Sequence, residues 1–361
     1  MSKAAELASL ASASETALSN RNIIINGAMQ ISQRATSSTT EGYSTVDRFK
    51  IDTGGGTITR TQEGLTSGSP YDEGFRNHLR LTVTSAGSNA ATDFCYITQV
   101  IEAQNIANSG WNYTSSSSYV TLQFWVRTSL AGTYYTVIRS VDGTARAFVM
   151  PVVLSANTWT KFTQTISGDS ATFEIDNNNG SGLNFEIRPY VGTNYSDSGV
   201  SPNTWYSRSG TTQTPDYAQN WQSTGSATFD LTGVQLEVGP VATPFEHRSV
   251  GQELQLCKRY FQKIGNMPGI CNGSTTLTAI GPYPVELRAT PTVGQTGVFN
   301  AQNSSDINNT QSGTGLGSNF GTNKSMFQAS IPNFSGLTAP EPILVAVPAN
   351  NGNRFTLDAE L

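Results

Sequence analysis

The residues best suited to ligand chemistry are aromatic side chains in the polar stretch from Tyr190 to Trp221. Flat aromatic rings suit the apolar faces of sugars, and the neighbouring Asn, Ser, Thr and Asp side chains would hydrogen-bond sugar hydroxyl groups. The candidate glycan-binding residues are Tyr195, Trp205, Tyr206, Tyr217 and Trp221. This interpretation predicts that Trp205→Ala and Trp221→Ala keep the fold and weaken ligand attachment. The alternative is that these two rings cap the open end of a β-sandwich or fill a subunit contact.

Residues suited to catalysis are few. The chain has two histidines, His78 and His247, and neither lies near a cysteine or a G-x-S-x-G motif. Cleavage of a glycosidic bond would need two facing carboxyl groups, one with a raised pKa. The candidate carboxylates are Asp47, Glu174, Glu186, Asp230 and Glu237. Their spacing pairs no two of them, so the sequence predicts a protein that is not an enzyme.

The composition excludes several classes of protein. Of the 361 residues, 37% are hydrophobic and 13% are charged, which allows a packed core in a fold with polar outer faces. The net charge is −5 and there is no run of Lys or Arg, which argues against nucleic-acid binding and against a polybasic membrane patch. The N-terminus has no continuous apolar segment, so we expect no secretory signal and no membrane insertion.

The cysteines suggest neither a disulfide framework nor a zinc site. The three residues, Cys95, Cys257 and Cys271, are odd in number and form no C-x-x-C motif. We expect buried free thiols.

The elements that must position these residues are strands. Between Ser226 and Arg248, two apolar alternations are out of phase by one residue at Gly233, which predicts one long strand with a β-bulge there. Tyr119–Val126 alternates clearly, and Tyr134–Met150 reads as a hairpin with Asp142-Gly143 at its tip. Many short strands separated by turns predict an all-β fold, a jelly-roll β-sandwich over residues 21–246.

Two helices are predicted beside the sandwich. Residues 1–20 would hold a short N-terminal helix for attachment or trimer contact, and residues 247–264 a connecting amphipathic helix. Residues 265–361 return to short β patterns and predict a small C-terminal β tip domain. The candidate oligomer-interface residues are Leu7, Ala11 and Leu18 in the first helix and Val250, Leu254, Cys257 and Phe261 in the second. A surface helix packed on its own domain is an equal alternative for residues 3–19.

Six segments together resemble the tail-fibre and related structural proteins of tailed bacteriophages, especially those of marine and cyanobacterial phages. They are R-N-I-I-I-N-G-A-M-Q-I-S-Q-R (21–34), V-D-R-F (46–49), Q-F-W-V-R (123–127), A-N-T-W-T-K-F-T (156–163), F-D-L-T-G-V-Q-L-E-V-G-P-V-A-T-P-F-E-H-R-S (229–249) and E-L-Q-L-C-K-R-Y-F (253–261). The ending L-D-A-E-L is similar to the family's C-terminal strand. The specificity lies in the set and its order.

The resemblance implies a homotrimeric virion appendage, assembled in the host cytoplasm, that contacts other tail or capsid proteins and host polysaccharide or lipopolysaccharide. The first half of this family resembles carbohydrate-binding modules with a jelly-roll fold, which often carry a structural calcium ion. Asp230 sits where one calcium ligand would be, but the first-strand position is the neutral Gln30, so we expect no metal and no cofactor. The alternatives are an architectural adaptor or capsid decoration protein and, less favoured, a glycan depolymerase.

Overall fold

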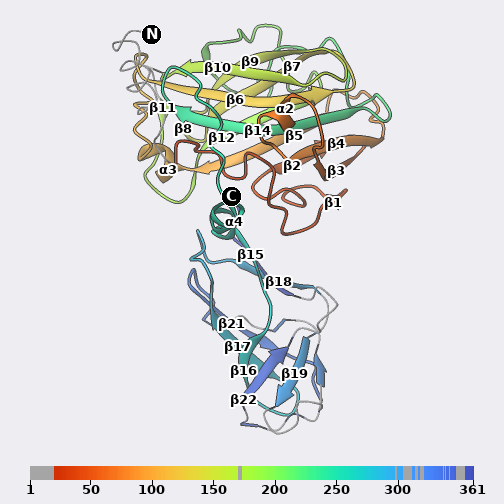
Figure 1. Cartoon of the computed structure of the whole chain (residues 1–361), viewed down its shortest axis with the longest axis vertical. Coiled ribbons are helices and arrows are strands. Elements are labelled where there is room, and N and C mark those ends of the chain that lie inside the picture. The colour runs from red at the N-terminus through yellow and green to blue at the C-terminus, as the bar shows by residue number, and fades with distance from the viewer. Residues whose placement is uncertain are drawn as a thin grey trace. The chain divides into compact units, whose positions relative to one another are not determined.

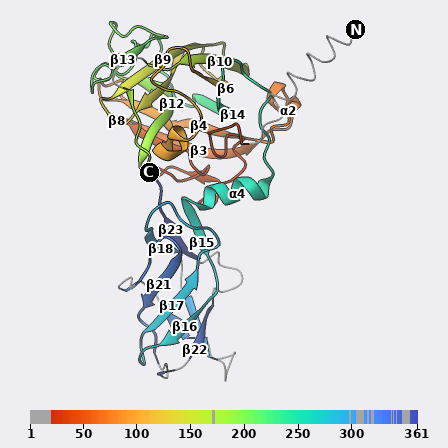
Figure 2. The ribbon, with the colours of Figure 1, turned by 90° about the vertical axis from the view of Figure 1, so that its left-hand side faces the viewer.

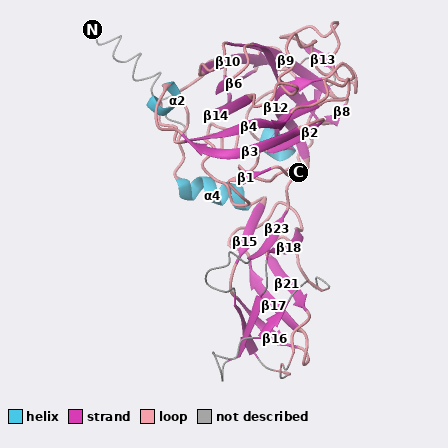
Figure 3. Cartoon of the chain, turned by 90° about the vertical axis from the view of Figure 1, so that its right-hand side faces the viewer, coloured by secondary structure: helices cyan, strands magenta, loops and turns pink. Residues whose placement is uncertain are grey.

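The computed structural model describes residues 20–169, 173–296, 299–303, 311–313, 316–317, 321–335, 337, 339–340, 342–346 and 354–361. The chain divides into two compact units, the first extending to Glu253 and the second containing Leu254–Glu360. The larger unit carries the two main sheets in Figure 1, and Figure 3 shows that strands far outnumber helices. The predicted helix over residues 3–19, with Leu7, Ala11 and Leu18, lies outside the described residues.

The first unit is an all-β jelly-roll sandwich of two antiparallel six-stranded sheets (Figure 2). Sheet A runs in the order β1 (Ser37–Ser38), β3 (Thr57–Gly64), β4 (Asn77–Ser85), β14 (Thr228–Val238), β6 (Tyr119–Thr128) and β10 (Thr160–Ser167). Sheet B runs in the order β13 (Trp205–Ser207), β9 (Arg146–Leu154), β7 (Gly132–Ser140), β12 (Ser181–Val191), β5 (Phe94–Glu102) and β2 (Lys50–Gly54).

The core lies between the sheets because alternate residues of each strand point inward. On β14 the inward residues include Phe229 and Leu231, and on β12 they include Leu183, Phe185 and Ile187, all at most 1% exposed. The residues between them, such as Asp230 on β14 and Glu186 on β12, therefore point to the outer faces. Each sheet has an apolar inner face, and its outer face carries charged side chains such as these.

The predicted bulge in β14 is confirmed. The pairing of β14 with β6 shifts register between Thr232 and Gln235, and Gly233 has a φ of 65°. A Cβ at Gly233 would lie 2.7 Å from the ring of Phe75, so the position needs glycine for space as well as for conformation. The bulge returns the apolar side chains to the core on both sides of the shift.

The hairpin of β7 and β9 is also confirmed, but its predicted two-residue tip is wrong. The two strands pair from Gly132↔Leu154 to Arg139↔Ala147. Asp142-Gly143 instead forms the short strand β8, which pairs with β11 (Phe173–Glu174). The connection is longer than two residues because its middle is used in this second pairing.

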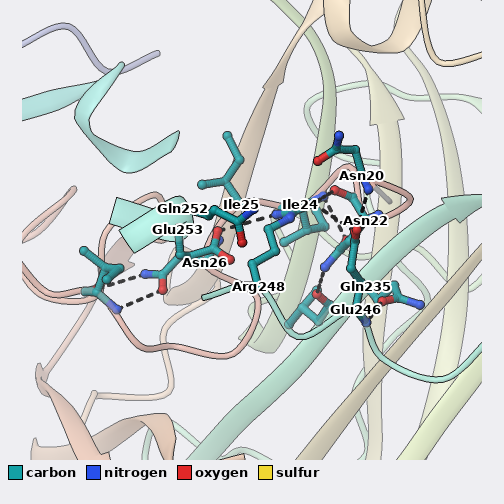
Figure 4. Close-up of polar contacts among 12 residues, drawn as sticks. Asn20, Asn22, Ile24, Ile25, Asn26, Gln235, Glu246, Arg248, Gln252 and Glu253 are labelled. Atoms are coloured by element: carbon teal, nitrogen blue, oxygen red, sulfur yellow. Dashed lines mark hydrogen bonds and ion pairs between the residues drawn. The ribbon is translucent and has the colours of Figure 1, made fainter. Parts of the chain in front are cut away.

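A buried polar network holds the first described segment, residues 20–31, against β14 and the chain that follows it (Figure 4). The side chain of Asn22 donates to Val234 O at 3.0 Å and accepts from Leu236 N at 3.1 Å. Glu246 Oε2 accepts from Asn22 N at 2.8 Å, and Arg248 donates to Asn22 O. These side chains complete backbone hydrogen bonds that no strand supplies.

The described residues of the second unit form two antiparallel sheets around their own core. The three-stranded sheet has the order β15 (Phe261–Ile264), β23 (Arg354–Asp358) and β18 (Thr292–Thr296). The six-stranded sheet has the order β20 (Gln311–Gly313), β19 (Phe299–Asn303), β22 (Pro342–Ala346), β16 (Met267–Cys271), β17 (Leu277–Pro282) and β21 (Met326–Ile331). The core includes Leu277, Phe327 and Phe355, each fully buried.

The described helices are short: α2 (Ser69–Asp72), α3 (Ala103–Ala107) and α4 (Val250–Lys258). None of them has the length and apolar character of a membrane-crossing helix. The connecting helix α4 confirms the predicted element, and the division between the two units falls inside it.

The predicted apolar stripe of α4 is split. Val250 is 60% exposed and Leu254 is half-buried, whereas Cys257 is buried and Phe261 is buried as the first residue of β15. Cys257 and Phe261 therefore pack within the single chain and do not lie on an open seam between chains, which corrects that part of the expectation. The helix ends before Phe261, so the four residues do not share one helical face.

Candidate ligand-binding site

The outer face of sheet B is partly covered by the long connection between β12 and β14. Val200 from this connection packs with Tyr135 and Val137 of β7 and with Ala147 and Val149 of β9. Outward-facing apolar residues on central strands need such a cover because water would otherwise contact them. The stretch predicted to bind ligand therefore has a structural role, which is to cover this face of sheet B.

Trp221 and Trp205 are structural residues. Trp221 is fully buried and donates from Nε1 to Thr228 O at 3.1 Å. Trp205 is half-buried, packs edge-on against Phe173 at a centroid distance of 4.9 Å, and donates from Nε1 to Ser167 O at 2.8 Å. The expectation that alanine at these positions leaves the fold intact is therefore wrong for Trp221, whose removal would leave a large cavity.

Tyr206 and Tyr217 also use their polar atoms inside the chain. The Tyr206 hydroxyl donates to Gln213 O at 2.6 Å, and the Tyr217 hydroxyl donates to Arg188 O at 2.9 Å. Burial raises the pKa of Tyr206 to about 12 and the pKa of Tyr217 well above its usual value. Of the five predicted aromatic residues, these two pin the connection to sheet B.

Tyr195 belongs to a different group of rings, which we call the aromatic ridge: Phe94, Tyr96 and Tyr195. Phe94 stacks on Tyr96 at a centroid distance of 4.9 Å, and Tyr195 meets Phe94 edge-on at 5.6 Å. All three are only half-buried. Gly54 of β2 lies opposite Phe94, whose ring fills the space where a Cβ would be. The ridge presents adjoining aromatic surface at the outer face of sheet B.

Beside the ridge lies a group of polar side chains that we call the sheet-B cluster: Arg139, Glu186, Arg188, Arg208 and Gln213. Arg188 is fully buried and donates to Glu186 through both Nε, at 2.9 Å, and Nη2. Arg139 donates to the other oxygen of Glu186. Arg188 Nη1 and Arg208 Nη2 both donate to Gln213 Oε1, at 3.0 Å and 2.7 Å.

The ridge and the cluster are joined through Tyr96. The Arg188 guanidinium lies over the Tyr96 ring at 4.7 Å, and the Tyr96 hydroxyl donates to Gln213 Oε1 at 3.3 Å. Burial raises the pKa of Tyr96 to about 12. The adjacent arginines outweigh burial for Glu186 and hold the pKa of its carboxyl at about 2. Glu186 is thus an ionised carboxylate at neutral pH.

The outer face of sheet A carries a second group, the sheet-A cluster: Glu63, His78, Arg80, Arg127 and Asp230. Register places Asp230 opposite Arg80 on β4 and Arg127 on β6. Arg80 Nε and Arg127 Nε each lie 2.7 Å from Asp230, and Arg80 Nη1 lies 2.7 Å from Glu63 Oε2. Asp230, considered above as a calcium ligand, is held by two guanidinium groups.

The five candidate carboxylates do not form a cleavage pair. Asp47 accepts from Gln33, Glu186 belongs to the sheet-B cluster, and Asp230 belongs to the sheet-A cluster. Glu237 accepts from Thr243, and Glu174 is exposed on β11. Burial raises the pKa of Asp47, but its described partners are polar groups and arginines. Glu186 and Asp230 lie on the outer faces of different sheets.

Sequence reasoning missed Phe94, Tyr96, Arg139, Arg188 and Arg208. A partial signal exists in the alternation of β5 and β12, where Phe94 and Tyr96 alternate with the buried Cys95 and Ile97, and Glu186 and Arg188 flank Ile187. This pattern places each set on one outer face. Nothing in the sequence brings Arg208 to them, because it lies in the connection after β13.

Comparisons with known proteins give fold likeness only. No family model matches the chain, and no curated protein matches it. Among solved structures, the carbohydrate-binding module CBM4 is 11% identical, with 60% of this chain and 99% of that chain covered and a TM-score of 0.32. A putative sugar-binding protein from Bacteroides thetaiotaomicron is 11% identical, with 60% and 100% covered and a TM-score of 0.29.

A cyclase from Fischerella sp. TAU is also similar, at 11% identity, with 62% of this chain and 98% of that chain covered and a TM-score of 0.33. The function has to be argued from the side chains of this chain.

Proposed function

We propose that this chain is a non-enzymatic structural appendage of a bacteriophage virion, such as a tail fibre, that attaches to glycan on the host surface. The observation that carries the binding part is the aromatic ridge beside the sheet-B cluster. Half-buried rings offer flat apolar surface to a sugar ring, and adjacent guanidinium and amide groups donate hydrogen bonds to its oxygens. Strands of sheet B and the connection that packs on them hold both features through hydrogen bonds, so a ligand would meet preorganised groups.

The virion assignment rests on the six segments that resemble phage tail-fibre proteins. Asn22, Glu246 and Arg248 lie in two of these segments, and the buried network that they form gives them a structural role. In this proposal the protein is assembled in the host cytoplasm and joins other tail or capsid proteins. Several copies would each make a weak contact with polysaccharide or lipopolysaccharide, and their high effective concentration would give avidity.

A purely architectural virion protein is the second candidate. It is favoured by the packing of Trp205, Tyr206, Tyr217 and Trp221, whose polar atoms bind within the sandwich. In that case the outer face of sheet B would contact only other virion proteins. A depolymerase is less favoured, and release of reducing sugar from host polysaccharide would detect it.

The deciding experiment measures binding of the purified protein to host cells before and after the surface polysaccharide is stripped. We expect saturable binding that is lost on stripping. The double variant Phe94→Ala/Tyr195→Ala should weaken binding at least about tenfold, since stacking on each ring contributes of the order of 1 kcal/mol. Trp159→Ala is the matched control, because Trp159 is a half-buried aromatic residue beside the sheet-A cluster.

Absence of cell binding by the folded protein would contradict glycan attachment and favour the architectural candidate. Equal weakening by the ridge variant and by the Trp159 control would contradict the location of the site.

The proposed homotrimer has its own test. Val250 at 60% and Leu256 at 36% are exposed apolar residues on α4, and Ile270 and Leu344 are exposed on neighbouring strands of the second unit. Leu254→Asp and the more exposed Val250→Asp should convert trimers to monomers, as measured by light scattering. Trimers that persist in both variants would contradict a trimer contact through α4.

A further inference from the structure

The sheet-B cluster holds more positive than negative charge. Three guanidinium groups, from Arg139, Arg188 and Arg208, are arranged around one carboxylate, that of Glu186. The other two arginines and Glu186 are the principal charged side chains that act on Arg208 among the described residues. The cluster therefore has a local charge of about +2 in a chain whose net charge is −5.

Glu186 accepts hydrogen bonds from Arg139 and Arg188, whereas Arg208 donates to Gln213. Arg208 Nη2 donates to Gln213 Oε1, an oxygen that also accepts from Arg188, and the buried Nε of Arg208 has no hydrogen-bond partner among the described residues. Burial and repulsion by Arg188 and Arg139 lower the pKa of Arg208 to about 10. A bound anion would accept a hydrogen bond from the buried Arg208 Nε and would offset the repulsion between the three guanidinium groups.

The sheet-A cluster differs because its positive and negative charges are equal in number. There, Arg80 and Arg127 meet two carboxylates, Asp230 and Glu63, so the charges balance. Both clusters lie on the outer faces of sheets in the same unit, and each contains a carboxylate at most 3% exposed. Only the sheet-B cluster has a cation in excess, and only it adjoins the aromatic ridge.

We infer that the sheet-B cluster binds an anionic group of an acidic glycan, with Arg208 and Arg139 as the contacting cations and the aromatic ridge holding the adjoining sugar. Arg139 has a side chain 21% exposed and Arg208 is half-buried, so both reach the surface. A guanidinium pairs with the two oxygens of a carboxylate or a sulfate through parallel hydrogen bonds. This inference rests on the proposed glycan attachment and specifies the class of glycan.

Two sources supply such an anion, a charged sugar and a free inorganic oxyanion, and the test separates them. The first arm measures the melting temperature in sodium sulfate and in sodium chloride at equal ionic strength. Sulfate stabilises proteins generally by exclusion from their surfaces, so each difference is compared between variants. We expect the sulfate-specific gain to be larger in the wild-type protein than in Arg208→Gln.

Arg127→Gln is the matched control. It removes the same charge from the sheet-A cluster, which lies on the other sheet and is neutral in the wild-type protein. This variant should keep the full sulfate-specific gain. An equal gain in all three proteins would overturn the anion site.

The second arm measures binding to two matched pairs of polymers: dextran sulfate with dextran, and polygalacturonate with its methyl ester. Each pair shares a sugar backbone and differs in charge. We expect the charged member to bind at least about tenfold more tightly, equivalent to ~1.4 kcal/mol, and Arg208→Gln to lose this preference while Arg127→Gln keeps it. General attraction is not the cause of such a preference, because the chain is itself acidic.

The remaining outcomes overturn different statements. If charged and neutral polymers bind equally and Arg208→Gln changes nothing, the acidic specificity is wrong and the proposed glycan attachment stands. If sulfate acts through Arg208 but no polymer or host cell is bound, the site serves a small inorganic anion and both the acidic-glycan inference and the proposed function are wrong. If both variants lose the preference equally, net charge and not this site decides binding.

Discussion

The two arginine clusters occupy comparable places, on the outer faces of the two sheets of one sandwich, yet they are built differently. The sheet-A cluster is assembled by strand register, which sets Asp230 opposite Arg80 and Arg127 on neighbouring strands. The sheet-B cluster takes two of its guanidinium groups from β7 and β12, and the third, Arg208, from the connection that folds over the sheet. The strands of sheet A produce a balanced cluster, whereas the strands of sheet B already set two guanidinium groups against one carboxylate, and the loop residue Arg208 adds a further positive charge.

The largest expected effect comes from removing the single acid of the unbalanced cluster. Glu186→Gln would leave three guanidinium groups without a carboxylate and should lower the free energy of unfolding by about 3–5 kcal/mol, as for a broken buried ion pair. Asp230→Asn should cost less, because Glu63 remains to neutralise Arg80. Urea denaturation of both variants measures the difference. Equal losses would contradict the difference in charge balance.

A smaller effect, of opposite sign in the two clusters, comes from removing one cation. Arg208→Gln should raise the free energy of unfolding by up to about 1 kcal/mol, because it relieves repulsion by Arg188 and Arg139 at a partly exposed position. Arg127→Gln should lower it by about 1–2 kcal/mol, because Asp230 loses a charged hydrogen-bond partner. Thermal melting in dilute chloride compares the two. If Arg208→Gln lost as much stability as Arg127→Gln, the two clusters would not differ in charge balance as described.

The smallest expected effect concerns pH and belongs to the sheet-A cluster. His78 is 3% exposed, and neither ring nitrogen has a hydrogen-bond partner in the part of the chain that the structure describes. Burial lowers its pKa below the ordinary 6.5 despite the nearby Asp230 and Glu63, and Arg80 and Arg127 lower it further. As pH falls below 6.5, the unfolded chain binds a proton before the folded chain does, so stability is lost in that direction.

His78→Gln should remove this contribution, so that the variant loses less stability than the wild-type protein as the pH falls below 6.5. The measurement is the free energy of unfolding of both proteins as the pH is lowered from 6.5. The sheet-B cluster does not titrate there, because Glu186 has a pKa of about 2 and stays ionised. Parallel pH profiles for the two proteins would show that His78 does not titrate as the geometry implies.

Much of the fold could be predicted because it depends on local alternation. The out-of-phase apolar residues around Gly233 place the β14 bulge at the right residue, and the strands β6, β7 and β9 lie where the sequence pattern predicts them. The tip at Asp142-Gly143 could not be predicted in the same way. Its conformation is decided by pairing with Phe173–Glu174, a segment about thirty residues away in sequence.

The candidate site was less accessible to sequence reasoning. The aromatic stretch was found, but its composition does not distinguish rings that bind a ligand from rings that fill a core, since both uses favour Trp and Tyr. The structure buried Trp221, pinned Tyr206 and Tyr217 to sheet B, and left Tyr195 beside Phe94 and Tyr96 from another strand.

By itself the sequence determined which residues of each strand face inward, because the pleat of a strand has a period of two and needs no partner to express it. It therefore determined that Glu186 and Arg188 share a face with each other and not with Phe185 and Ile187. Only the tertiary structure decided that Arg208 joins them and that their charges fail to balance. The electrostatic potential at a point sums charges by distance in space, and those distances are set by how the chain folds over itself.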